Sequence, residues 1–347
     1  MKIAADGISA RFDASLGILT GFDVGGVSPL HTAPWVGSSV GQEEMPEDAA
    51  PHLAKLGGDF FCAPFGSTEG NSPLHGWPPN SPWDAEMHGN VLRAKLRRKV
   101  QGADLSKEIT LLDGHPFVYQ RHIFDGGKGA LAVANHANVS LLLGGAIYTS
   151  PKSWWETPET APEPDPTRGR SSLKYPARGS ATQFPSENGT ADLTRFPWGG
   201  AHEDFVCGLE ESGHALGWTA VARTGRDDVF LSLRDARQLP MTMLWHSNGG
   251  RDYAPWSGRH RNCLGVEEGA ALAMLSDSDQ RDFPARGALE LGGRVDICHV
   301  IGALPWPDGE PVTNIELRGD RLLISGQSGS QVSVPIAADR IFSDGGP

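Results

Sequence analysis

Two adjacent glutamates, Glu267 and Glu268, end the short apolar run CLGVEE. A carboxylate can accept a proton from a hydroxyl group, so either side chain could serve as a general base. Successive side chains of a strand point to opposite faces, and therefore at most one of the two can face a given cleft. The other would meet solvent or a basic neighbour such as Arg259 or Arg261. A strand that simply ends in water is the alternative interpretation.

Two histidines could supply the acid that complements such a base. His75 lies in the loop sequence PLHG and is followed by Trp83, whereas His136 lies beside Asn135 in the strand-like run VANHANVSL. A histidine titrates near neutral pH and can give a proton to an ether oxygen. A tryptophan can stack on the apolar face of a pyranose, and the glycine after His75 lets the backbone approach a ligand closely. Taken singly, each histidine is more often a loop hydrogen-bonding group or a satisfied core residue.

Short β-rich segments must position these side chains. ISARFD and ILTGFDV open the chain, and two further β-rich runs flank DGHP, a good hairpin turn. Later segments of the same kind are DFVCGLE, ALGWTAVAR, DVFLSLR, MTMLWH, IELRG, RLLISG and QVSVPI. The 44 glycines and 26 prolines suit many strands joined by turns better than long helices. The pattern predicts an all-β fold, either a β-sandwich or a barrel.

One segment differs in composition from the rest. Residues 149–200 are rich in Pro, Ser, Thr and Gly, which is compatible with disorder. The segment also holds Trp154, Trp155, Tyr175 and Trp198, which are costly to expose, so we expect a long ordered loop folded over one face. Strand patterns continue on both sides of it, and we therefore expect a single domain over residues 1–347.

Charge and cysteine usage restrict the class of protein. The net charge of −12 and the pI near 5.4 argue against nonspecific nucleic-acid binding, which needs a basic face. The four cysteines lie far apart with no C-x-x-C pair, so neither a zinc framework nor a disulfide scaffold is expected. The N-terminus lacks the apolar core of a signal peptide, and no run approaches the length of a membrane span. We expect a cytoplasmic protein with no membrane partner.

The ordered set of motifs resembles the aldose 1-epimerase family, within the galactose mutarotase-like superfamily. PLHG followed by Trp83 resembles the sugar-binding loop of that family, and NHANVSL resembles the strand that bears its catalytic histidine. LPMTMLWHSNGG resembles the segment that precedes the last site strand, and LGVEE resembles the strand end that bears the catalytic glutamate. No single motif is highly specific, and the resemblance depends on their order and wide spacing over roughly residues 55 to 270.

The resemblance implies a large antiparallel β-sandwich with a sugar site on a concave face. Glu267 would take the proton from the anomeric hydroxyl, and His136 would protonate the ring oxygen and so open the ring. Rotation about the C1–C2 bond and reclosure would give the other anomer. No metal or organic cofactor is implied. The resemblance suggests these substrate-binding residues: His75, Trp83, Asn135, Asp204 and Trp245.

The sequence departs from the family pattern at three places. No arginine stands between Lys55 and Arg93, where the family often has one. Asp204 is only a loose match to the aspartate of the family, and Glu268 replaces its proline. These departures predict a divergent member. Four basic residues near the last site strand could bind a sugar phosphate, although a solvated loop is the more common role of such a cluster: Arg251, Arg259, His260 and Arg261.

The sequence therefore predicts an isomerase similar to the aldose 1-epimerases, acting on a small sugar as a monomer or homodimer. A non-catalytic carbohydrate-binding or sensing protein of the same fold and a sugar-phosphate epimerase are the alternatives. A glycan lyase or hydrolase on the same sandwich is a third possibility, but such enzymes usually carry additional domains. Because one fold hosts many functions, the choice depends on the placement of His136 and Glu267.

Overall fold

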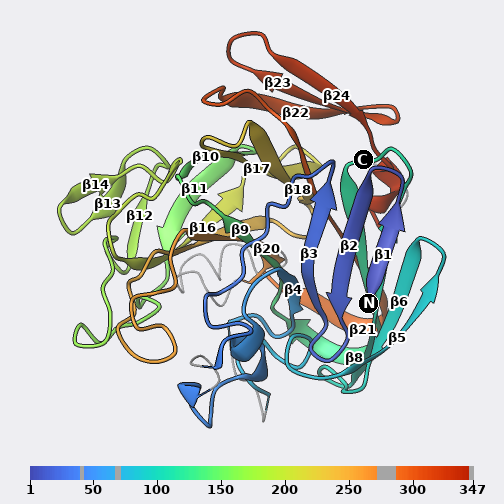
Figure 1. Cartoon of the computed structure of the whole chain (residues 1–347), viewed down its shortest axis with the longest axis horizontal. Helices are drawn as coiled ribbons and strands as arrows, with labels where there is room; N and C mark the ends of the chain where they lie inside the picture. Colours follow the sequence, from blue (N-terminus) through green and yellow to red (C-terminus); the bar gives the residue numbers. More distant parts are fainter. Residues whose placement is uncertain (40–42, 67–71, 272–286, 344–347) are drawn as a thin grey trace.

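Antiparallel strands build almost the whole molecule in the computed structural model, which describes residues 1–39, 43–66, 72–271 and 287–343. A ten-stranded sheet runs in the order β1-β2-β3-β4-β9-β20-β19-β16-β11-β12 (Figure 1). Its strands are β1 (Lys2–Ala5), β2 (Ile8–Asp13), β3 (Ile18–Val24), β4 (Asp59–Cys62), β9 (Val133–Ser140), β20 (Cys263–Ala270), β19 (Met241–Ser247), β16 (Glu203–Glu210), β11 (Lys152–Thr157) and β12 (Ala177–Gly179).

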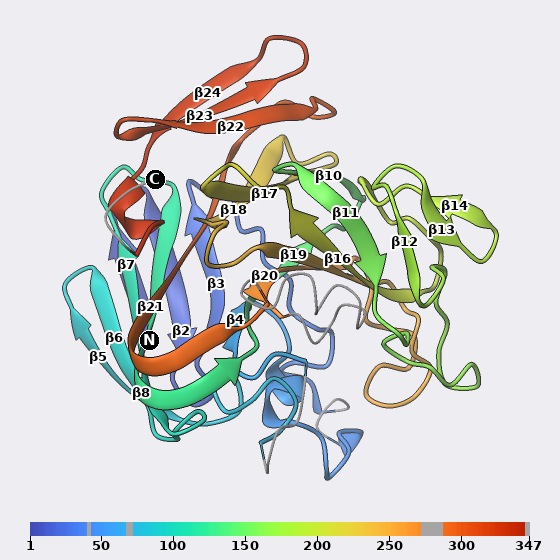
Figure 2. The same ribbon diagram turned by 180° about the vertical axis from the view of Figure 1, so that it is seen from behind.

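A second, nine-stranded sheet runs in the order β15-β10-β17-β18-β21-β8-β7-β6-β5 and is seen from behind in Figure 2. Its strands are β15 (Arg195–Phe196), β10 (Gly145–Thr149), β17 (Leu216–Arg223), β18 (Asp228–Asp235), β21 (Leu289–Pro305), β8 (Phe117–Leu131), β7 (Ala103–Leu111), β6 (Val91–Leu96) and β5 (Trp83–His88). β7 and β8 pair across the DGHP turn, as the sequence predicts. The all-β antiparallel sandwich is confirmed.

Alternation along the strands decides which side chains reach the core. In β6 the buried positions alternate with exposed ones, as expected for a strand with one solvated face. All eight residues of β20 are buried, so both faces of this central strand are covered. Val266 and Leu264 on its inner face share a hydrophobic cluster with Phe124 and Ile301 of the nine-stranded sheet. We call the opposite side of the ten-stranded sheet the outer face.

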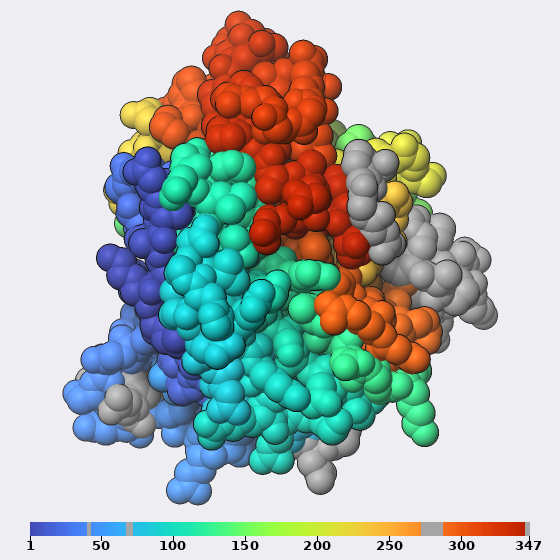
Figure 3. All heavy atoms as spheres, turned by 90° about the vertical axis from the view of Figure 1, so that its right-hand side faces the viewer, coloured from blue at the N-terminus to red at the C-terminus, as the bar shows by residue number. Residues whose placement is uncertain are grey.

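A small C-terminal sheet stands on the rest of the fold. It consists of β22 (Val312–Arg318), β23 (Arg321–Gly326) and β24 (Gln331–Pro335), and it rises above the body of the molecule in Figure 3. Ile315, Leu322 and Ile324 share a hydrophobic cluster with Val229 of β18 and Trp306. Two short 3-10 turns lie at Pro51–Lys55 and Ala338–Arg340 in the part of the chain that the structure describes. Among the described residues, no helix is long and apolar enough to cross a membrane.

Residues 149–200 are more regular than a long loop. β11 and β12 extend the edge of the ten-stranded sheet, and β13 (Phe184–Ser186) and β14 (Gly189–Ala191) form a separate hairpin. Trp155 is buried against this edge, as the cost of exposing tryptophan requires. Composition alone missed these strands because each is short and lacks a long apolar run.

The side chain of Glu268 points into the interior, not to solvent. Its carboxylate lies 2.7 Å from Nη1 of Arg234 and accepts hydrogen bonds from Thr219 at 2.6 Å and Thr242 at 2.8 Å. Neither Glu268 nor Arg234 is exposed to solvent. The expectation that Glu268 meets solvent, Arg259 or Arg261 is therefore wrong, because the second sheet covers the inner face of β20 and supplies its own arginine. Arg234 also contacts Glu210, which pairs with Lys152, so the network contains two carboxylates and two cations.

Removing the charge of Glu268 should destabilise the protein without changing its fold. Glu268→Gln leaves the buried Arg234 with one carboxylate fewer, and breaking a buried ion pair costs about 3 kcal/mol or more. We expect the free energy of unfolding, measured by urea titration followed by tryptophan fluorescence, to fall by about that amount. The control Glu290→Gln, at an exposed position of β21, should change it by less than about 0.5 kcal/mol. Equal effects of the two substitutions would contradict the assigned network.

Candidate functional site

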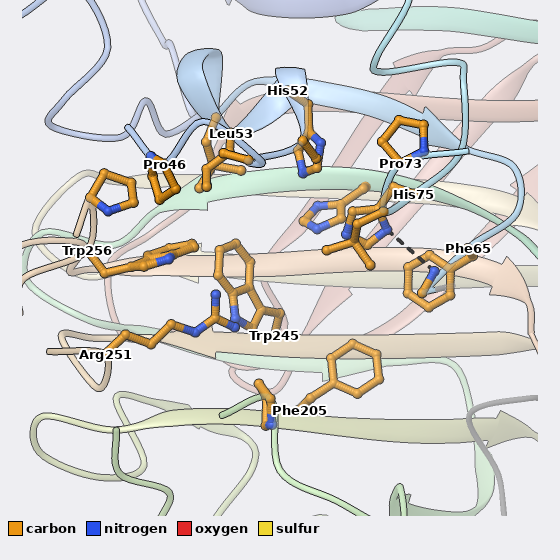
Figure 4. A pocket seen from close by; sticks show the side chains of 18 of the residues that line it. Pro46, His52, Leu53, Phe65, Pro73, His75, Phe205, Trp245, Arg251 and Trp256 are labelled. Carbon is orange, nitrogen blue, oxygen red and sulfur yellow. Dashed lines mark hydrogen bonds between the residues drawn. The ribbon is translucent and has the colours of Figure 1, made fainter. Parts of the chain in front are cut away.

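A cavity of about 1110 Å³ opens on the outer face of the ten-stranded sheet (Figure 4). Its floor consists of side chains from five neighbouring strands, namely Phe60, His136, Glu267, Trp245 and Phe205. Phe60 pairs in register with His136, and His136 with Glu267, while Trp245 pairs with Phe205. Binding sites for small molecules occupy roughly 300–1,000 Å³. The cavity therefore has room for a sugar ring and a substituent.

His136 and Glu267 touch at the bottom of this cavity. Nε2 of His136 lies 3.2 Å from Oε1 of Glu267, and both side chains are almost fully buried. The contact follows from the strand pairing, because the two residues are direct partners in the β9–β20 ladder and their side chains share one face. The phenyl ring of Phe60 stacks on the imidazole at 4.5 Å and fixes its plane. The two groups that the sequence suggested for proton transfer thus form one unit.

The missing side chain of Gly265 leaves space for this pair. A Cβ atom at this position would lie 2.7 Å from Oε1 of Glu267 and 2.9 Å from Cβ of Trp245. Contacts that short do not occur between real atoms, so any other residue would push the carboxylate or the indole away. Gly265 is therefore required by close approach and not by its backbone conformation.

Burial favours the uncharged forms of both groups. It raises the pKa of Glu267 well above its usual value and lowers the pKa of His136 to about 3, with a smaller contribution from His52. Desolvation penalises an ionised carboxyl and an imidazolium alike. The pair therefore keeps one proton over a wide pH range. That proton can lie on the carboxyl or on the imidazole, because moving it between the two leaves the total unchanged.

Two further histidines line the cavity, His52 from the first 3-10 turn and His75 from the PLHG loop (Figure 4). Asn80 joins their segments. Its Oδ1 accepts hydrogen bonds from the backbone N–H and from Nδ1 of His52, both at 2.9 Å, and its Nδ2 donates to the carbonyls of Leu74 and Gly76. Because Oδ1 is an acceptor, Nδ1 of His52 carries the hydrogen and Nε2 is left as an acceptor.

The glycine of PLHG has a structural role. Gly76 has φ near +73°, and a Cβ atom there would lie 1.9 Å from the carbonyl oxygen of Ala63. A glycine is therefore needed at position 76 because two backbone segments pack directly against each other. The close approach to a ligand that the sequence suggested does not explain this glycine. His75 itself has a φ of 67°, which is uncommon for a residue with a side chain. This conformation brings His75 to the cavity wall.

An aromatic and cationic wall closes the other side of the cavity. Trp245 donates from Nε1 to Oε1 of Glu203 at 2.7 Å, and the Arg251 side chain lies 3.6 Å from the same oxygen. The guanidinium of Arg251 also lies over the ring of Trp256 at 4.3 Å. Burial raises the pKa of Glu203 to about 7, although Arg251 opposes the shift. Arg251 thus faces the cavity, and its solvated-loop interpretation is wrong.

Three predicted substrate-binding residues do not line the cavity. Trp83 is buried in the inter-sheet core, where its Nε1 donates to the carbonyl of Pro78. Asn135 and Asp204 each precede a cavity residue in their strand and so point to the opposite face. Asn135 accepts a hydrogen bond from His122, and Asp204 accepts several from the segment 172–175. All three therefore support the walls and are too remote to touch a ligand in the cavity.

The structure also places residues that the sequence patterns missed. His52 comes from a 3-10 turn, so no periodic signal marks it. Phe205 lies in the predicted strand DFVCGLE, and strand alternation relative to Trp245 could have identified it. Of the remaining basic residues, Arg259 contacts Glu44, and His260 is buried beside Trp245, outside the cavity lining. His260 approaches His31 and Cys263, a cluster treated below.

Comparison with known proteins supports the fold. No protein-family model and no curated protein matches the chain. A solved structure of a provisionally assigned aldose 1-epimerase from Escherichia coli K12 aligns with a TM-score of 0.60 at 12% identity, covering 88% of this chain and 98% of that one. A second from Klebsiella pneumoniae subsp. pneumoniae MGH 78578 aligns with a TM-score of 0.54 at 14% identity, covering 86% and 77%.

A TPR-domain containing protein from Parabacteroides distasonis ATCC 8503 also aligns, with a TM-score of 0.52 at 12% identity. The alignment covers 91% of this chain and 49% of that one, so this chain spans about half of its length. At such identities the likeness shows the fold alone. The resemblance suggested by the sequence motifs is confirmed at this level, as a divergent chain with the architecture of the aldose 1-epimerases.

The stability of the protein should depend on pH through His136. The pKa of His136 in the folded protein, about 3, lies below the ordinary histidine pKa of 6.5, so below pH 6.5 the unfolded chain binds a proton that the folded protein does not. His136 therefore favours folding above pH 6.5, and this contribution is lost by about 1.4 kcal/mol per pH unit as the pH falls toward 3. His136→Gln should flatten the pH dependence of the unfolding free energy by that slope between pH 6 and 4. His88→Gln, at an exposed position, is the control, and parallel curves for His136→Gln and the wild type would contradict the assignment.

Proposed function

We propose that the protein is an aldose 1-epimerase-like isomerase that interconverts the α and β anomers of a sugar. The observation that supports this proposal is the contact of Nε2 of His136 with Oε1 of Glu267, at 3.2 Å, on the floor of a cavity that has room for a pyranose. The anomeric oxygen and the ring oxygen of a pyranose are bonded to the same carbon. An acid and a base that serve both oxygens must therefore lie next to each other.

Ring opening would require two proton transfers and the cleavage of one bond. The carboxylate of Glu267 takes the proton of the C1 hydroxyl, the C1–O5 bond breaks with its electron pair going to O5, and His136 donates a proton to O5. C1 becomes an aldehyde carbon. Rotation about the C1–C2 bond presents the other face of this carbonyl, and the same steps in reverse close the ring. Sugar and enzyme each end with the number of protons that they had at the start.

The proton content of the pair suits this cycle. Ring opening starts from ionised Glu267 and protonated His136 and ends with both groups neutral. Burial favours the neutral pair, as the directions of the two pKa shifts indicate. Hydrogen bonds from the hydroxyls of a bound sugar can stabilise the ionised form, because they replace the water lost on burial. Binding of the substrate would thus itself favour the ionised form of Glu267.

The remaining cavity residues suit the recognition of a sugar. Trp245 and Phe205 offer aromatic surface for the apolar face of a pyranose. His75 and His52 carry ring nitrogens that can exchange hydrogen bonds with hydroxyls, and burial lowers the pKa of both so that they stay neutral. Neutral imidazoles can be donors on one nitrogen and acceptors on the other, which matches the dual character of a hydroxyl group.

A sugar with an anionic substituent is a second candidate substrate, in line with a sugar-phosphate epimerase. Arg251 and Arg168 both line the cavity, and the exposed Arg168 lies over the ring of Tyr253 at 4.1 Å. Guanidinium groups bind phosphate and carboxylate groups with paired hydrogen bonds. Arg251 would take the place of the arginine that the sequence lacks between Lys55 and Arg93.

We also propose a cytoplasmic setting, which the four free cysteines favour.

The catalytic role of the pair can be tested by NMR magnetisation exchange between sugar anomers. Loss of one proton-transfer group typically costs about 10²–10⁴-fold in rate. We expect Glu267→Gln and His136→Asn to lose exchange by about that factor on glucose, galactose and their 6-phosphates. Glu268→Gln, the sequence neighbour on the opposite face, is the matched control and should lose far less when assayed well below its unfolding temperature.

Each outcome of this experiment discriminates between the proposals. Exchange that survives in Glu267→Gln would remove the proposed base. Equal losses at positions 267 and 268 would contradict the face assignment of β20. Chemical-shift perturbation of a sugar without accelerated exchange would favour the binding or sensing protein over the isomerase.

The second candidate predicts a selective role for Arg251. A hydrogen bond to a charged group contributes about 1.5 kcal/mol or more, which is about tenfold in affinity. Arg251→Gln should therefore raise the KM for hexose 6-phosphates about tenfold and leave the KM for the neutral hexoses nearly unchanged. Arg259→Gln, outside the cavity lining, is the control. An equal rise in KM for neutral and phosphorylated sugars would contradict a subsite that binds an anionic substituent.

A further inference from the structure

A second group of potential metal ligands lies behind the cavity wall. His31, His260 and Cys263 come from three different segments, and one ligand atom of each lies within 4.8 Å of the others. Cys263 and His260 are buried, and His31 is half-buried. The rings of His31 and His260 meet edge to face at 4.9 Å. None of the three is among the described residues that line the cavity.

The two histidines present ring nitrogens that lack a hydrogen-bond partner. Nε2 of His31 and Nε2 of His260 are both inaccessible to solvent and unpaired. Buried polar atoms are nearly always satisfied, so two unpaired nitrogens in one cluster need an explanation. Sγ of Cys263 has only a weak contact, 3.8 Å from Oδ1 of Asn138. A metal ion that bound all three atoms would satisfy both nitrogens at once.

A hydrogen-bond chain behind His260 prepares it as a ligand. Oγ of Ser247 lies 3.0 Å from Oε2 of Glu203 and 2.6 Å from Nδ1 of His260. When Glu203 is ionised, Ser247 donates to it and accepts the hydrogen on Nδ1. The lone pair of His260 then lies on Nε2, the ring nitrogen that has no hydrogen-bond partner. A carboxylate that orients a metal-binding histidine in this way is a common feature of zinc sites.

We propose that His31, His260 and Cys263 form a binding site for Zn²⁺, separate from the cavity and independent of the proposed function. Two imidazoles and one thiolate are a ligand set that zinc prefers, and three protein ligands leave a fourth position for water. Atoms bound to one zinc ion at about 2.0–2.3 Å lie roughly 3–4 Å apart. The ligand atoms, now within 4.8 Å of one another, would therefore have to approach by about 1 Å to close the site.

Zinc binding would exchange a proton for the metal. A cysteine thiol is mostly protonated near neutral pH, so this ligand must lose its proton when the metal binds. The S–H bond breaks, the sulfur lone pair binds Zn²⁺ and one proton leaves to the buffer. The bound ion would tie the segment around His31 to β20. His260 stacks on the indole of Trp245 at 5.4 Å, so the ion would also stiffen the wall of the cavity.

The test uses the full chain without an affinity tag, freed of metal by dialysis against chelator. Isothermal titration with Zn²⁺ should give one ion per chain with release of about one proton, measured from the dependence of the heat on the buffer. Co²⁺ in place of Zn²⁺ should give sulfur-to-metal charge-transfer absorption. Cys263→Ser should abolish this absorption and His31→Gln should weaken Zn²⁺ binding at least tenfold, whereas Cys207→Ser, a buried thiol elsewhere in the same sheet, should change neither.

A measurement on the wild type covers the case in which a variant fails to fold. X-ray absorption of the zinc-loaded protein should show one sulfur at about 2.3 Å and about three nitrogen or oxygen neighbours at about 2.0 Å, namely the two imidazoles and a water. No stoichiometric binding, a zinc environment without sulfur, or charge-transfer absorption that survives in Cys263→Ser would overturn the proposal. These readouts do not involve sugar, so the site can fail while the isomerase proposal stands, and the reverse.

Discussion

The alternation of β20 places an ionisable group in the interior on each of its faces. Glu268 points to the inner face and is neutralised by Arg234, whereas Glu267 points to the outer face and contacts His136. Two adjacent glutamates can both be buried in one strand because the desolvation penalty of each carboxyl group is offset in a different way. The inner one is paired with a permanent cation, and the outer one keeps a proton. The same strand thus contributes to the stability of the sandwich and to the chemistry of the cavity.

The outer face shows how a protein prepares a reactive pair without a permanent charge. Phe60 covers the imidazole, and the missing side chain of Gly265 leaves room for the carboxylate. Water is largely displaced from both groups, which shifts both equilibria toward the neutral forms. The charge needed for catalysis would appear only when a polar ligand replaces that water. Reactivity would then be coupled to occupancy of the cavity.

Much of the fold could be predicted from the sequence, because strand alternation and turn residues are local signals. The ordered motifs also identified Glu267, His136, His75 and Trp245, which the structure brings to one cavity. Contacts between distant segments could not be predicted in this way. Arg234, which neutralises Glu268, is contributed by the other sheet, and no local pattern links them. The wrong assignment of Asn135 as a substrate-binding residue could have been avoided. Asn135 is adjacent to His136 in a strand, so its side chain must point to the opposite face.

Asn80 has a consequence for how tightly the cavity could hold a ligand. Its amide connects the 3-10 turn that carries His52 with the loop that carries His75, so hydrogen bonds hold the two segments together. A ligand that touches both histidines does not have to order them, and the entropy of ordering was already lost when the chain folded. Asn80 therefore contributes preorganisation without any contact of its own. A change of residue at position 80 would therefore alter the affinity of the cavity for a ligand, although every residue that touches the ligand stays the same.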